Sequence, residues 1–107
     1  MIYRSRAAAV SAALDLCKGL GSRWCPVVKE DGPFWRASAT FFVLLVEPGL
    51  GCFYATLGND KMQGDTPMGA VRILLDRVKE RHERLAERYR MELARMTTAI
   101  DSGTKPD

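Results

Sequence analysis

One apolar stripe in the last third of the chain constrains its fold more than any other feature. Large and mostly apolar side chains recur there at steps of three and four residues, the spacing of one face of an α-helix. The stripe consists of Met68, Val71, Leu75, Val78, His82, Leu85, Tyr89, Leu93, Met96 and Ile100. A helix from Pro67 to Ile100 would be about 50 Å long, whereas the rest of the chain would form a body only about 28 Å across. The pattern therefore predicts that a second polypeptide covers the far end of the stripe.

Length and composition favour a single globular domain. The chain has 107 residues, of which 47% are hydrophobic and 27% charged, as in an ordinary folded protein. We expect one α+β domain over residues 1–101 and a disordered tail over residues 102–107, which are small and polar. No stretch reaches the roughly 18 consecutive apolar residues of a membrane-spanning helix, so no membrane partner is expected.

The cysteines indicate the compartment. Cys17, Cys25 and Cys52 are odd in number, and their spacing matches neither a disulfide framework nor a CxxC pair. Free thiols of this kind are typical of a reducing compartment. The sequence therefore predicts a cytoplasmic protein.

Turn and capping residues divide the chain into an α-β-β-β-α order. A first helix is expected over Ser5–Lys18, with Ser5 as its N-cap and glycines to end it. Three strands of an antiparallel meander follow, and the turns between them are Asp31-Gly32 and Pro48-Gly49. The strands are expected at Trp24–Glu30, Phe34–Glu47 and Gly51–Leu57. A long C-terminal helix, at about residues 66–101, is capped by Asp65 or Thr66 and has Pro67 in its first turn.

This order of elements resembles that of the double-stranded-RNA-binding domain over residues 5 to about 90. Such domains place a basic cluster at the start of the second helix to hold phosphates. This chain has two acids and one lysine there, over Asp60–Pro67. The resemblance therefore implies a fold, and no RNA-binding residue is carried over from it.

Alternation along the strands assigns side chains to the two faces of the sheet. One face is apolar throughout and is expected to form the core beneath the helices. The other face carries a cluster of Phe42, Leu44, Val46, Phe53 and Leu57. Such a cluster is large for the surface of a monomer, so it is a second candidate contact surface. The alternative is that the long strand bends near Ser38, or that the last helix wraps across, and buries the cluster internally.

Arginines are frequent on the C-terminal helix, but glutamates alternate with them. Eight basic and five acidic residues over 72–95 are typical of a solvated helix with ion pairs between successive turns. The alternative is an arginine comb that binds phosphates through Arg81, Arg84 and Arg88. The intervening acids, which would repel a phosphate backbone, favour the first interpretation.

No motif indicates catalysis, a cofactor or a metal. His82, the only histidine, lies on the apolar stripe and is expected to pack there. The three cysteines with His82 lack the short local spacing of a zinc site. Gly49-Leu50-Gly51 falls in a hairpin, which is the wrong context for a dinucleotide-binding loop.

These observations predict a small non-enzymatic protein-binding module that acts as an inhibitor or adaptor by occlusion. Its partner is another protein or a second copy of the chain, and nucleic-acid binding is the alternative. The predicted protein interface comprises Leu85, Tyr89, Leu93, Met96 and Ile100 on the helix and Phe42, Leu44, Val46 and Phe53 on the sheet.

Overall fold

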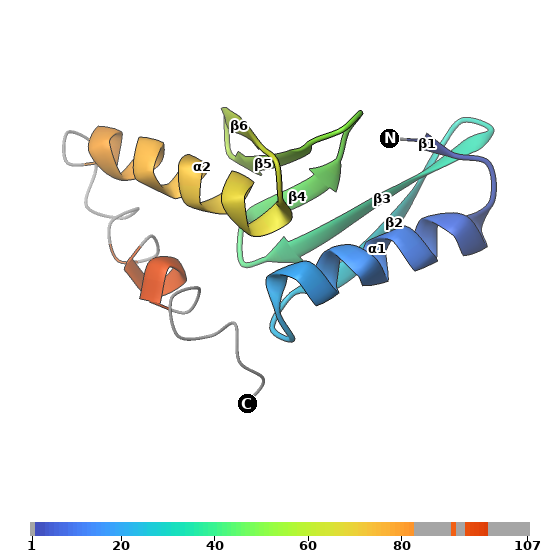
Figure 1. The fold of residues 1–107 in the computed structure, drawn as a ribbon, viewed down its shortest axis with the longest axis horizontal. Coiled ribbons are helices and arrows are strands. Elements are labelled where there is room, and N and C mark those ends of the chain that lie inside the picture. The colour runs from blue at the N-terminus through green and yellow to red at the C-terminus, as the bar shows by residue number, and fades with distance from the viewer. Residues whose placement is uncertain (1, 83–90, 92–93, 99–107) are drawn as a thin grey trace.

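Two helices cover one face of an antiparallel sheet (Figure 1). The computed structural model describes residues 2–82, 91 and 94–98. The elements in chain order are β1 (Ile2–Tyr3), α1 (Arg6–Leu20), β2 (Cys25–Asp31), β3 (Phe34–Phe41), β4 (Leu44–Pro48), β5 (Phe53–Leu57), β6 (Asp60–Gly64) and α2 (Pro67–His82). The predicted α+β class is confirmed.

The sheet is larger than predicted. Strands β2 to β6 form a continuous antiparallel meander, and β1 pairs with the beginning of β3. Because β4 pairs with the end of β3, β1 and β4 share one edge of that strand: Tyr3 lies opposite Trp35, and Leu44 lies opposite Phe41. The three-stranded meander, on which the likeness to the double-stranded-RNA-binding domain depended, is therefore wrong.

A tight turn divides the strand that was predicted as one piece over Phe34–Glu47. The β3–β4 turn consists of Phe42 and Val43, with Phe41 and Leu44 paired on either side. Phe42 has φ +53° and is the one non-glycine residue with a positive φ in the described part of the chain. Two bulky residues do not signal a turn, because turns at this position favour glycine or asparagine.

This turn reverses the predicted faces of the strand that follows it. In a continuous strand, Leu44 would lie on the face opposite Phe41, but a two-residue turn places paired residues on the same face. Leu44 and Val46 are 0% exposed and belong to the core beneath the helices. The predicted exposure of these two residues is therefore wrong, whereas Phe42 of the same cluster is exposed in the turn.

Small side chains let α1 approach the sheet closely. Ala9 and Ala13 are buried against Ala37 of β3. The helix begins as predicted, because the Ser5 hydroxyl accepts a hydrogen bond from the Ala8 N–H at 3.1 Å. It continues through Gly19 and ends at Gly21, whose N–H bonds to the Cys17 carbonyl at 2.8 Å.

The start of α2 lies against β6, which the sequence did not indicate. Thr66 caps the helix by accepting a hydrogen bond from the Gly69 N–H at 2.9 Å. A Cβ atom added to Gly64 would lie 2.5 Å from the backbone nitrogen of Ala70. The absence of a side chain at Gly64 therefore sets how closely α2 packs on the edge of the sheet.

Replacing Gly64 by alanine is expected to lower the free energy of unfolding by about 1–3 kcal/mol, because α2 must move away from β6. Urea denaturation followed by circular dichroism would measure this loss. Gly19→Ala is the matched control, because its Cβ would meet only the Pro67 ring, whose nearest atom, Cγ, lies at 3.4 Å. An equal effect of both substitutions would contradict the close contact at Gly64.

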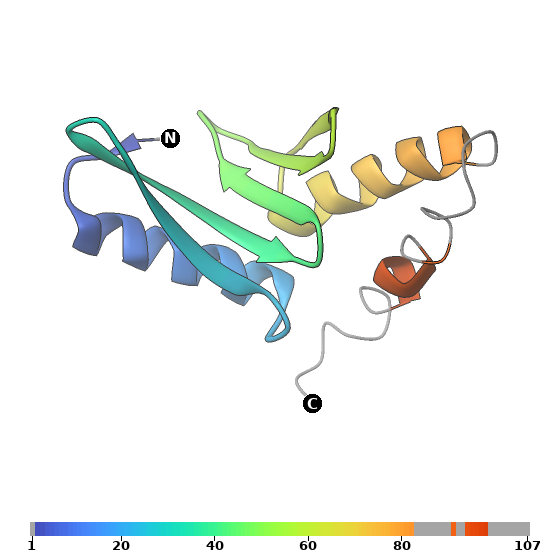
Figure 2. The ribbon, with the colours of Figure 1, turned by 180° about the vertical axis from the view of Figure 1, so that it is seen from behind.

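The C-terminal segment returns to the core. Residues 94–98 are helical, and Met96 is 1% exposed in the cluster that contains Phe41 and Val78. In one straight helix, Met96 would lie about 27 Å beyond Val78. Figures 1 and 2 both show residues 94–98 beneath α2 and beside the β3–β4 turn. The prediction of one continuous helix over residues 66–101 is therefore wrong, since the body of the protein itself buries Met96.

Candidate protein-binding surface

The β3–β4 turn carries apolar side chains where a turn usually carries polar ones. Phe42 is 47% exposed and Val43 is 53% exposed. A positive φ at the first central residue alone is typical of a type II′ turn, which favours glycine there. A bulky residue in this region costs about 1–3 kcal/mol. The turn therefore combines backbone strain with exposed apolar area, and both are unfavourable for folding alone.

Aromatic rings connect this turn to the core. The ring centroids of Trp24 and Phe41 are 5.4 Å apart, and those of Phe41 and Phe42 are 4.5 Å apart. The Arg95 guanidinium carbon lies 5.7 Å from the Phe42 centroid. Such contacts hold the Phe42 ring in place, so the turn presents a preorganised surface.

Arg95, whose guanidinium lies over the Phe42 ring, adds a cation beside the two apolar side chains of the turn. We call Phe42, Val43 and Arg95 the tip surface. It combines apolar side chains with one cation. This composition is typical of the centre of protein–protein interfaces, where aromatic residues and arginine are enriched.

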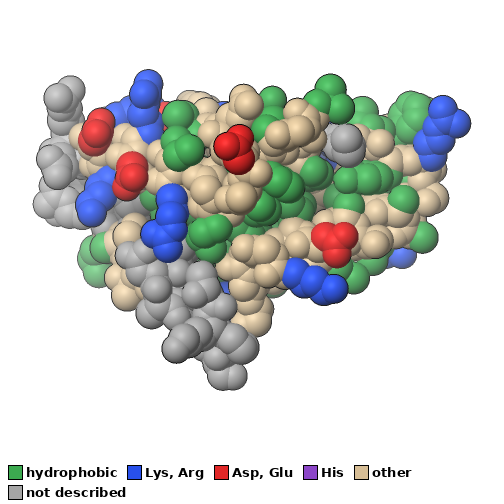
Figure 3. All heavy atoms as spheres, viewed as in Figure 1, with side chains coloured by type: hydrophobic (Ala, Val, Ile, Leu, Met, Phe, Trp, Pro, Cys, Tyr) green, Lys and Arg blue, Asp and Glu red, His purple; other side chains and the backbone are tan. Residues whose placement is uncertain are grey.

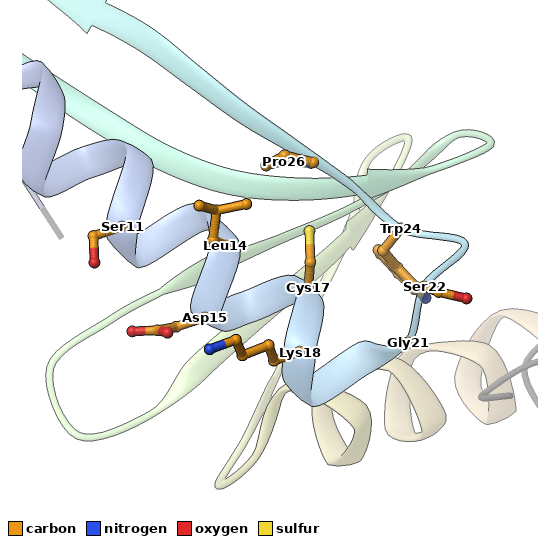
Figure 4. Close-up of a pocket in the computed structure, with 9 residues that line it drawn as sticks. All are labelled: Ser11, Leu14, Asp15, Cys17, Lys18, Gly21, Ser22, Trp24 and Pro26. Atoms are coloured by element: carbon orange, nitrogen blue, oxygen red, sulfur yellow. The ribbon is translucent and has the colours of Figure 1, made fainter. Parts of the chain in front are cut away.

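A groove lies between α1 and the start of β2 (Figure 4) and has a volume of about 620 Å³. It is lined by Ser11, Leu14, Asp15, Cys17, Lys18, Gly21, Ser22, Trp24 and Pro26. In Figure 4, Leu14 and Cys17 point towards β2, whereas Asp15 and Lys18 extend from another side of the helix. The α1–β2 groove thus has an apolar floor and a rim that carries one acid and one base.

The thiol in this groove is not activated. Burial raises the pKa of Cys17, and the nearby Cys25 raises it further. At neutral pH the thiol is therefore protonated, and the protonated form is a poor nucleophile and a poor metal ligand. Within the described part of the chain, no cluster of three histidine, cysteine, aspartate or glutamate side chains could hold a metal ion.

A second, smaller hollow of about 200 Å³ lies between α1 and the start of α2. Hydrophobic side chains gather in it, as Figure 3 shows. Its lining is Tyr3, Ala12, Asp15, Leu16, Pro48, Phe53 and Pro67. Phe53, which the sequence assigned to the exposed sheet face, thus lies half-buried on the helix side.

The opposite face of the sheet is not covered by α1 or α2 (Figure 2). Its side chains are mixed in character, and several interact with one another. Arg36 forms an ion pair with Asp31 at 2.7 Å, which raises the pKa of the Arg36 guanidinium. The Lys61 ammonium lies 4.8 Å from the centroid of the Tyr54 ring. This face is therefore more polar than the sequence analysis predicted.

The predicted interface residues that the structure describes lie in three different environments, and Phe53 is the half-buried one. Phe42 is exposed on the tip surface, whereas Leu44, Val46 and Met96 are buried in the core, which conflicts with an interface role for them. The remaining helix residues of the prediction lie outside the described residues, as does the predicted tail over 102–107. They are Leu85, Tyr89, Leu93 and Ile100.

The arginine comb is described only at its first member. Arg81 forms an ion pair with Asp60 at the start of β6. Arg84 and Arg88 lie outside the described residues. A phosphate that approached Arg81 would therefore meet a carboxylate as well, and this pairing gives no support to a nucleic-acid site.

Sequence reasoning missed Val43 and the α1–β2 groove. The sequence does contain a signal for the position of Val43 in a turn, because Phe42 and Val43 come directly after the alternating strand Phe34–Phe41. Their apolar character concealed the turn. The groove has no local signal, because it forms only when α1 packs beside β2.

None of the helices that the structure describes has the length and apolar character needed to cross a membrane. Comparison of the chain with models of protein families, with curated proteins and with solved structures gave no match.

Proposed function

We propose that this chain is a small non-enzymatic protein-binding module that acts as an adaptor or inhibitor by occlusion, and that the tip surface is its contact site. The observation that carries the proposal is the Phe42-Val43 turn, where two apolar side chains are exposed on a strained backbone. Strain and exposure of this kind are retained in proteins chiefly where they serve binding.

The energetics indicate the extent of the contact. Full burial of a large apolar side chain contributes about 1.5–3 kcal/mol, and Phe42 and Val43 are already about half buried. Association costs at least about 4 kcal/mol in lost motional freedom. Burial of the part of these two side chains that is still exposed does not offset this cost. The tip surface is therefore the centre of a larger contact area, in which neighbouring residues exclude water from its edge.

The reducing cytoplasm is the compartment we propose for this module. Cys17, Cys25 and Cys52 are all free thiols. Disulfide-free cysteines of this kind suit a compartment in which thiols stay reduced.

Affinity capture from a lysate of the native host tests the proposal. The test variant combines Phe42→Gly with Val43→Ser, which suits a type II′ turn and removes the apolar tip. We expect its stability to stay within about 1 kcal/mol of the wild type, because relief of strain offsets the lost ring contact. The wild type should recover a specific partner that the variant does not, as quantified by mass spectrometry.

Ile73→Ser is the matched control, since Ile73 on α2 is exposed to a similar extent, at 44%. This control should recover the same partner as the wild type. Recovery of the same proteins in equal amounts by the wild type and the tip variant would contradict the proposal.

A further inference from the structure

β2 forms one edge of the sheet. Each of its seven residues pairs with a residue of β3, and no further strand in the described part of the chain pairs with it. An edge strand presents a row of backbone N–H and C=O groups that another extended chain can bind. The outer edge of β2 is therefore a candidate site for an added strand.

The register shows which backbone groups point outward. In an antiparallel ladder, pairs that exchange hydrogen bonds alternate with pairs whose N–H and C=O groups point away from each other. Asp31 and Phe34, which flank a two-residue turn, form a pair of the first kind. By alternation, Pro26, Val28 and Glu30 belong to pairs of the second kind. Because proline has no N–H, the outer edge offers the N–H groups of Val28 and Glu30 and the carbonyl groups of all three residues.

The α1–β2 groove lies beside this edge, on the helix side of the sheet. Pro26 lines the groove and pairs with Ala39, which is fully buried beneath the helices. Figure 4 shows Pro26 on β2, with Leu14 and Cys17 directed towards this strand from α1. An added strand would lie about 4.8 Å from β2, and residues directly opposite each other point to the same face of a sheet. The side chain opposite Pro26 would therefore enter the groove.

The groove and the edge together define the chemistry of the occupant. Leu14, Cys17 and Trp24 make the groove apolar, and its volume of about 620 Å³ admits a large side chain. The residue opposite Pro26 is therefore expected to be apolar. Glu30 is exposed and lies on the same face, four residues further along β2. A basic residue opposite Glu30 would form a cross-strand ion pair.

A second copy of the chain fits this edge less well. Two β2 strands related by a twofold axis at Val28 would use all the outward N–H groups of both copies. This pairing, however, places Glu30 of each copy opposite Pro26 of the other. The Glu30 carboxylate would then lie over the apolar floor of the groove, with Asp15 as well as Lys18 on the rim. Desolvation of this carboxylate would oppose the association.

We propose that the outer edge of β2 binds an extended segment of another protein as an added antiparallel strand. The segment carries an apolar side chain that enters the α1–β2 groove and, four residues before it, a basic side chain that pairs with Glu30. Main-chain hydrogen bonds hold the segment, and these two side chains select it. The edge shares no residue with the tip surface, so either surface can bind its partner without the other.

A backbone amide NMR titration of the full chain with the capped heptapeptide Thr-Lys-Thr-Val-Thr-Phe-Thr tests the proposal. The lysine, valine and phenylalanine of this peptide would lie opposite Glu30, Val28 and Pro26. The amide signals of Val28 and Glu30 should shift, whereas those of α2 should not. N-methylation of the peptide valine should weaken binding about tenfold, because it removes a hydrogen bond to β2. N-methylation of the threonine that follows the valine is the matched control, since its N–H points away from β2, and should leave the affinity unchanged.

Charge reversal tests the second contact. Glu30→Lys should weaken binding of the peptide about threefold, and a peptide with glutamate in place of its lysine should restore the affinity. This recovery also shows that the variant is folded. Glu80→Lys is the matched control, because Glu80 is an exposed acid on α2, and it should bind both peptides as the wild type does.

Three results of the titrations would each overturn the proposal. They are the absence of shifts at millimolar peptide, equal affinities of the two methylated peptides, and binding of both charge forms of the peptide by Glu30→Lys as by the wild type. Sedimentation of the chain adds a fourth. A wild type at twice the chain mass of 11.9 kDa that becomes monomeric on Val28→Pro, which removes one outward N–H, would assign the edge to a second copy.

Discussion

Replacing Met96 by alanine is expected to lower the free energy of unfolding by about 2–5 kcal/mol. Met96 is 1% exposed and packs in the main core cluster, so its removal leaves a cavity that the surrounding side chains fill only in part. Met96 is the buried residue of the segment 94–98, so the substitution also weakens the packing of this segment on the core. Urea denaturation followed by tryptophan fluorescence would measure it.

Met91→Ala provides the control, since Met91 precedes this segment in the sequence. Met91 is 76% exposed, so its truncation should change the free energy of unfolding by no more than about 0.5 kcal/mol. If Met96→Ala had as little effect as Met91→Ala, the segment 94–98 would not be packed on the core. The single long helix of the sequence analysis would then regain support.

Truncation of Leu44 and of its neighbour Leu45 should have unequal effects. Leu44 is fully buried beneath the helices, so Leu44→Ala should cost about 2–5 kcal/mol. Leu45 is half-buried on the opposite face, so Leu45→Ala should cost only about 1 kcal/mol. Both values follow from chemical denaturation of the two variants under the same conditions.

The comparison tests the turn at Phe42-Val43. A strand without that turn would keep the alternation of Phe34–Phe41 and bury Leu45 in place of Leu44. A larger cost for Leu45→Ala than for Leu44→Ala would therefore contradict the hairpin and restore the strand predicted from the sequence.

Residues with strong local preferences made part of the fold predictable. Ser5 caps α1 as predicted, and Thr66, one of the two predicted candidates, caps α2, because their hydroxyls accept hydrogen bonds from backbone N–H groups three residues later. Ala37, Ala39 and Phe41 alternate into the core as expected. These features depend on neighbours in the sequence, which is why pattern alone identified them.

The features that were missed depend on tertiary contacts. The Phe42-Val43 turn has no turn residue, and β6 consists of Asp60–Gly64, which has no β-branched residue. The apolar residues from Met68 to Ile100 keep their helical spacing, and no residue among them signals the end of a helix. The pattern therefore could not indicate that Met96 returns to the core. Of the candidate site, the sequence predicted Phe42 but not the groove, because α1 and β2 form the groove together.

Site-specific photo-cross-linking in the native host tests the central claim, that the tip surface binds another protein, most directly. Val43 and, in a separate variant, Ile73 would be replaced by a benzoylphenylalanine residue, since both side chains are exposed. The account predicts a discrete adduct with another protein from position 43 and none from position 73. The absence of any adduct from position 43, or identical adducts from both positions, would contradict it.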